Sequence, residues 1–143
     1  MKISLPTFII SLLSEAGGYL ESETRINKLV FLGSKEHNIQ TSAVFSWSHW
    51  GPLSFNVNKT LKDLHNDGLI QIKKEKRETV FGDEYMINTY TITEKGKQAA
   101  LELGEKLPAD LQNNISTLYE LFGKIRLSAL LNYVHTVYSP EDL

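Results

Sequence analysis

Apolar positions recur at helical spacing along most of this chain. The first stripe covers residues 6–16 and ends at two glycines. Ser22 or Thr24 can cap a second helix. That helix is apolar on all sides over residues 29–32, so we expect it to be buried from two sides. Further helical patterns cover residues 54–66, 93–103, 108–122 and 125–138.

Three segments have the composition of strands, which favour β-branched and aromatic residues. Residues 44–50 form the first, and Gly51-Pro52 is expected to break it. Residues 69–76 and 85–93 predict a hairpin with its turn at Gly82-Asp83. The order of elements predicts an α+β fold that is mostly helical. We expect a winged helix-turn-helix domain over residues 1–103 and, over 104–143, an extension of two or three additional C-terminal helices.

The distribution of charge gives the first indication of function. The net charge is only −2, but residues 25–77 hold nine bases against four acids, whereas residues 78–143 hold five against ten. The basic segment contains the third helix and the start of the hairpin. Positive charge therefore lies on the elements that a winged helix presents to a duplex. The alternative is that a segment of this length reaches +5 by chance.

These features predict a sequence-specific DNA-binding protein, a transcriptional regulator. The helix over 54–66 would read the major groove, and a wing over 73–84 would contact the backbone. Asn and Lys on the outward face of that helix can pair with base edges, and the remaining bases would hold phosphates. The alternative is that these side chains form an ordinary solvated face. The candidate DNA-binding residues are Arg25, Lys28, Ser54, Asn56, Lys59, Lys62, Lys73, Lys74, Lys76 and Arg77.

A second hypothesis stays open because some residues do not suit a DNA surface. Asp63 and Glu75 lie among the bases and would repel phosphate. Phe55 falls on the exposed face of the reading helix, where it either packs on the first helix or belongs to a protein-binding patch. The alternative function is a protein-interaction or antitoxin-like module with a winged-helix fold that does not bind DNA.

Other kinds of site have little support. Trp47 and Trp50 flank His49 and could line an effector pocket, although such aromatics more often join a strand to the core. The four histidines lack metal-site spacing, and no catalytic or cofactor motif is present, so we expect no metal, no cofactor and no enzymatic activity. The chain has no cysteine, which suits a cytoplasmic protein. The apolar residues 3–13 are too few to span a bilayer.

Several ordered motifs resemble a known group of proteins. They are Lys28-Leu29-Val30-Phe31-Leu32, Trp50-Gly51-Pro52-Leu53-Ser54, Leu61 with Leu64, Gly68-Leu69-Ile70, Tyr90-x-Ile92-Thr93-x-x-Gly96, and Leu130-Leu131-x-Tyr133-Val134-His135 with Tyr138. Over residues 25–140 the set resembles small winged-helix proteins of the YwgA-like type and, more distantly, Panacea-type antitoxin domains. The resemblance implies a winged-helix fold, dimerisation and a regulatory role. The chain departs from the family near its end, where a serine separates the tyrosine from the Pro-Glu pair.

The last two helices carry more apolar surface than a minimal winged helix can bury. They are expected to form a homodimer, which would place two reading helices about one DNA turn apart or a multiple of it. The competing expectation is that they fold back onto the second helix, and both can hold at once. The candidate dimerisation residues are Leu118, Phe122, Leu127, Leu130, Leu131, Val134 and Val137.

Overall fold

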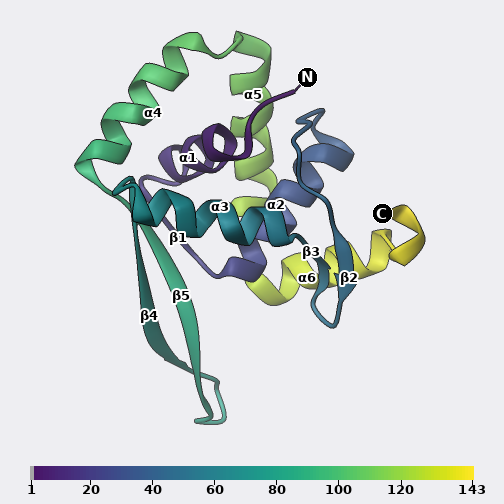
Figure 1. Cartoon of the computed structure of the whole chain (residues 1–143). Coiled ribbons are helices and arrows are strands. Elements are labelled where there is room, and N and C mark those ends of the chain that lie inside the picture. Colours follow the sequence, from purple (N-terminus) through teal and green to yellow (C-terminus); the bar gives the residue numbers. More distant parts are fainter. Residues whose placement is uncertain (1) are drawn as a thin grey trace.

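The computed structural model describes residues 2–143 and has an α+β fold that is 56% helical (Figure 1). The helices are α1 (Leu5–Glu15), α2 (Glu23–Glu36), α3 (Phe55–Asn66), α4 (Glu94–Lys106), α5 (Ala109–Leu118) and α6 (Leu127–Val137), with a π-helical turn, η1 (Tyr119–Gly123), and a 3₁₀ turn, η2 (Pro140–Asp142). The strands are β1 (Tyr19–Glu21), β2 (Ser46–Ser48), β3 (Gly51–Leu53), β4 (Ile70–Glu78) and β5 (Glu84–Ile92).

Two helices form the centre of the core. α1 packs against α3, α4 and α5, and α2 packs against α3, α5 and α6. All residues from Ile26 to Gly33 of α2 are buried, which confirms the expectation that this helix is covered on two sides. Leu111, Ile115, Leu118, Leu130 and Val134 from the C-terminal helices join the same apolar cluster. The C-terminal segment therefore shares one core with the rest of the chain.

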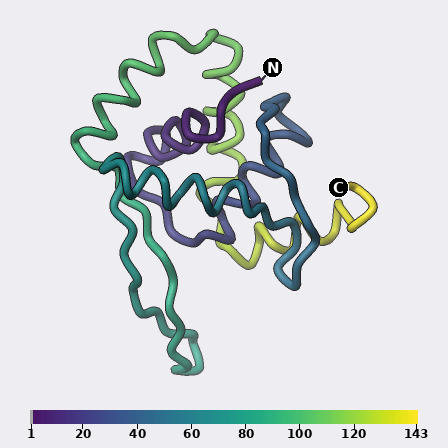
Figure 2. The backbone as a smooth tube through the Cα atoms, viewed as in Figure 1, coloured from purple at the N-terminus to yellow at the C-terminus, as the bar shows by residue number. Residues whose placement is uncertain are grey.

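The larger sheet has the order β1-β5-β4, and all its pairs are antiparallel. β4 and β5 pair over their full nine residues, from Ile70 opposite Ile92 to Glu78 opposite Glu84. β1 covers only Thr89–Thr91 of β5. Beyond that point the two strands leave the body as a long hairpin (Figures 1 and 2).

The strand predicted over 44–50 is wrong in extent. β2 and β3 form a separate two-stranded ribbon, and the chain reverses at His49-Trp50. Gly51 and Pro52 lie inside β3 and do not end a strand. Gly51 has a φ of +87°, and a Cβ there would lie 3.2 Å from Lys28 Cε. A glycine at this position therefore provides both the conformation and the space that the ribbon needs.

The structure shows that three of the expected dimerisation residues cannot contact a partner. Leu118, Leu130 and Val134 have no exposed surface, because they face the core. Phe122 is half-buried and packs beside the rings of His37 and Tyr133. The others keep some exposed surface: Leu127 and Leu131 are half-buried and Val137 is half-exposed.

Candidate nucleic-acid interface

A buried amide fixes the start of α3 against α2. Ser54 caps α3 by accepting a hydrogen bond from the Val57 amide at 3.3 Å. The Asn27 side chain accepts from the Ser54 backbone at 2.8 Å and donates to Asn58 Oδ1 at 2.8 Å. Both Ser54 and Asn27 are fully buried, so Ser54 has a capping role and is not a DNA contact. Sequence reasoning missed Asn27, although a polar residue inside an apolar helical run is a signal.

The outward face of α3 carries the side chains expected there. Asn56, Lys59 and Lys62 are exposed. Phe55 is 81% exposed, so it does not pack on α1. Lys59 forms an exposed ion pair with Asp63 at 2.9 Å, which contributes little to stability. Within residues 2–143, Lys62 is the lysine of α3 that has no ion-pair partner.

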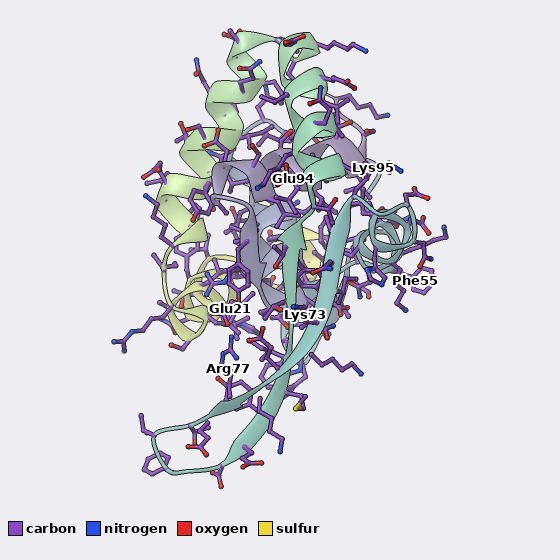
Figure 3. The ribbon with its side chains drawn as sticks, turned by 90° about the vertical axis from the view of Figure 1, so that its left-hand side faces the viewer. Glu21, Phe55, Lys73, Arg77, Glu94 and Lys95 are labelled. Atoms are coloured by element: carbon purple, nitrogen blue, oxygen red, sulfur yellow. The ribbon has the colours of Figure 1, made fainter. Side chains whose placement is uncertain are left out.

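The basic cluster of the hairpin is divided between two faces. Alternation along β4 places Lys74 and Lys76 on one face of the sheet and Lys73 and Arg77 on the other. Arg77 donates to Glu21 at 2.7 Å and to Glu75 at 2.9 Å, contacts that raise the pKa of its guanidinium (Figure 3). Arg77 therefore ties the hairpin to β1. The prediction that it is free to contact phosphate is wrong, because both carboxylates already bind its guanidinium.

Lys76 is also partly occupied. Its ammonium lies 3.7 Å from a carboxylate oxygen of Glu84. Lys73 and Lys74 are exposed and have no ion pair within the described part of the chain. Of the four predicted wing bases, these two are free to meet an anion, and they point to opposite sides of the hairpin.

A groove between α3 and the hairpin brings two of the free lysines together. Its volume is about 300 Å³. Lys62 contributes from α3 and Lys74 from β4, while Glu23 from the start of α2 adds one carboxylate. Tyr90 forms part of the floor, and burial raises the pKa of its phenol to about 12. Two ammonium groups on separate elements are an arrangement that can hold a phosphate backbone.

The two predicted phosphate contacts on α2 bind backbone carbonyls of the chain itself, and burial shows that the prediction for Lys28 is wrong. Arg25 is half-buried and donates to the carbonyls of Gly123 and Ile125, the latter at 2.7 Å. Lys28 has no exposed surface and donates to the Pro52 carbonyl at 2.7 Å. Burial lowers the pKa of Lys28 to about 8. Both side chains hold neighbouring segments onto α2, and Lys28 has no exposed surface that could meet a ligand.

The predicted aromatic site is divided as well. The Trp47 ring meets His135 edge to face at 5.5 Å, and the Trp50 ring meets His49 at 4.7 Å. Trp50 lines a second, larger groove of about 590 Å³ between the hairpin and α6, together with Leu127 and Leu131. Trp47 is not among the residues that line it. The two tryptophans therefore do not form a shared effector pocket.

No cluster of His, Asp and Glu suited to a metal ion occurs within residues 2–143. No helix in that range has the length and apolar character to cross a membrane. Comparison of the chain with protein-family models, with curated proteins and with solved structures gave no match. The resemblance to YwgA-like proteins and Panacea-type domains therefore stays a prediction.

Proposed function

We propose that this chain is a winged-helix DNA-binding protein that regulates transcription. The order α1-β1-α2-β2-β3-α3-β4-β5 supports the fold assignment, because a short β1 pairs with the hairpin and only the β2-β3 ribbon is added between α2 and α3. One observation carries the function: Lys62 and Lys74, both exposed and without an ion pair among residues 2–143, line one groove between the reading helix and the wing. The duplex would lie against α3 and the side of the hairpin that faces it.

The N-terminal half of α3 supplies side chains that suit base edges. Asn56 already accepts a hydrogen bond from the Val44 amide, which leaves its NH₂ group free to donate. Lys59 can reach guanine once it exchanges Asp63 for a base. Phe55 would contact a thymine methyl group. Base reading would therefore come from α3, while Lys62 and Lys74 hold the backbone.

Fluorescence anisotropy with mixed genomic duplexes tests the proposal at about 50 and 200 mM salt, a range over which phosphate-dominated binding falls steeply. We expect Lys62→Ala/Lys74→Ala to weaken binding and to reduce the salt slope by about two. The matched control is Lys2→Ala/Lys106→Ala, which removes the same charge from exposed positions outside the groove. The absence of binding at the lower salt would overturn the proposal. Equal losses in both double variants would show that net charge, and not this groove, drives binding.

A protein-interaction module, for example an antitoxin-like neutraliser, is the second candidate. The observation that favours it is the exposed apolar pair at the start of α3. Phe55 is 81% exposed and Val44 is 73% exposed, and the Val44 amide donates to Asn56 beside Phe55. Apolar burial is not screened by salt. This candidate therefore predicts a complex with a protein partner that persists at high salt and is lost in Phe55→Ser.

A further inference from the structure

The outer half of the hairpin has only two strands. β1 pairs with Thr89–Thr91, and the last contact on that side is the Ser22 amide, which donates to the Asn88 carbonyl at 2.8 Å. Residues 84–87 of β5 pair with no strand on this edge within the described chain (Figure 1). Two-stranded hairpins are marginally stable alone, and a third strand strengthens them.

The two edges of this hairpin differ in chemistry. The β4 edge carries Lys73, Lys74 and Lys76, and such charges protect an edge from pairing with another chain. The free β5 edge carries Tyr85, which is 47% exposed, and Met86, which is 55% exposed. An apolar edge of this kind is a site at which another strand can add by main-chain hydrogen bonds.

The register shows which backbone groups are free. The Ser22 amide donates to the Asn88 carbonyl, and the Ile92 amide donates to the Gly18 carbonyl. Even-numbered residues of β5 therefore direct their N–H and C=O groups away from β4, because these groups alternate along a strand. Continued outward, the alternation leaves the backbone groups of Glu84 and Met86 facing the open edge.

Two further apolar features lie close to this edge. The 590 Å³ groove is lined on one side by Lys74 and by residues 85–88 of the edge itself, and on the other by Trp50, Leu127 and Leu131. At the tip of the hairpin, Val80 is 95% exposed and Phe81 is 90% exposed. The tip is also acidic, and its carboxylates come from Glu78, Asp83 and Glu84.

We propose that the β5 edge pairs antiparallel with the same edge of a second copy, about a two-fold axis at Tyr85. This register places Glu84 opposite the partner's Met86 and Met86 opposite the partner's Glu84. It uses the free backbone groups of both residues and leaves the Ser22 contact intact. The two Tyr85 rings then form a cross-strand aromatic pair, a favourable combination.

The same register explains the exposed tip. Each hairpin tip ends at Asn88 of the other copy, where Ser22 occupies the edge, and enters the groove there, so that Phe81 meets Leu127 and Leu131. The acidic tip of each copy also approaches Lys74 of the other copy. The partner's Glu84 lies on the same face of the joined sheet as this lysine. This charge complementarity and the self-matching register favour a second copy over an unrelated peptide. The inference does not rest on DNA binding, and its test contains no DNA.

The first test is disulfide cross-linking, which is clean because the chain has no native cysteine. In the proposed dimer the two Cα atoms of residue 85 are about 4.5 Å apart, within the range that a disulfide spans. We expect Tyr85→Cys to form a covalent dimer under mild oxidation. The control, Lys76→Cys, lies on β4 and would be about three strand spacings from its counterpart, too far to bridge. Equal cross-linking of both variants would overturn the proposal.

Sedimentation of the untagged chain over a range of concentrations is the second test. We expect a dimer that Tyr85→Lys dissociates, because like charges would then lie directly opposite each other. Phe81→Ser should raise the dimer Kd by at least about tenfold, whereas Phe55→Ser, which removes equal apolar surface elsewhere, should not. Circular dichroism checks that each variant folds. A monomer at all concentrations, or a dimer that both Tyr85→Lys and Phe81→Ser leave unchanged, would overturn the proposal.

Discussion

Replacing the buried lysine of α2 should stabilise the protein in a pH-dependent way. Lys28 is completely buried, and its ammonium makes one hydrogen bond in the described structure, to the Pro52 carbonyl at 2.7 Å. An ammonium has three donors, so burial leaves this group poorly solvated. We expect Lys28→Met, which keeps the length of the side chain and removes the charge, to raise the free energy of unfolding at neutral pH.

The magnitude follows from the pKa of Lys28, which burial lowers from 10.5 to about 8. The difference corresponds to about 3 kcal/mol against the charged form in the folded state. Between these two pKa values the unfolded chain binds more protons than the folded chain, so stability rises with pH. From about pH 7 to about pH 9.5 the wild type should gain about 2 kcal/mol.

The methionine variant lacks this titration and should show no such gain. Near pH 7 the variant should have a higher free energy of unfolding than the wild type, because it no longer buries a charge. The hydrogen bond that the Pro52 carbonyl loses reduces this gain by about 1 kcal/mol. The variant's advantage over the wild type should therefore shrink as the pH rises.

Urea unfolding at the two pH values, followed by circular dichroism, measures the difference. Lys62→Met is the control, because it makes the same substitution at an exposed position of another helix. Parallel pH profiles for the wild type and Lys28→Met would contradict this prediction. They would show that the Lys28 ammonium is as well solvated in the folded state as in the unfolded chain.

Two further predictions concern packing and the hairpin. Gly96→Ala places a Cβ against the Leu69 carbonyl and should lower the free energy of unfolding by about 2 kcal/mol or more. Gly104→Ala lies in open space on the same helix and should raise that free energy by about 0.5–1 kcal/mol. Thermal unfolding of the two variants measures the difference. Arg77→Gln removes the ion pair with Glu21 and should increase hydrogen exchange in the hairpin while leaving any duplex affinity unchanged. A loss of affinity in that variant would return Arg77 to the DNA surface.

The helices could be predicted because their ends depend on local contacts. Ser22, Ser54 and Thr93 each cap a helix through the amide three residues ahead. Those contacts lie within one helical turn, so the sequence contains both partners. The apolar spacing within each helix then indicates the buried face. The same logic failed at Gly51-Pro52, because a glycine-proline pair is compatible with a turn and also with a short edge strand.

Burial of the α2 bases could not be predicted from local sequence. Arg25 bonds to Ile125, which is 100 positions away, and Lys28 bonds to Pro52, 24 positions away. Whether a lysine is solvated depends on which distant segments cover it. The division of the wing bases between two faces, in contrast, could be predicted from the sequence. Lys73 and Lys74 are neighbours on a predicted strand, and side chains alternate between the two faces of a strand.

The hairpin can serve both proposed roles because its charge changes along its length. Lys73 and Lys74 lie near the body, whereas Glu78, Asp83 and Glu84 surround the tip, so a duplex attracted by the base of the hairpin would be repelled by its end. Lys74 lines both the groove beside α3 and the groove beside α6.

If both proposals hold, Lys74 is the residue that they share. Removing its charge should affect duplex binding and self-association together. Lys62 lines the groove beside α3 and not the groove beside α6, so its loss should affect only duplex binding. Phe81 lies at the acidic tip, so its loss should affect only self-association. Because these two single changes act on one property each, the failure of one proposal would leave the other intact.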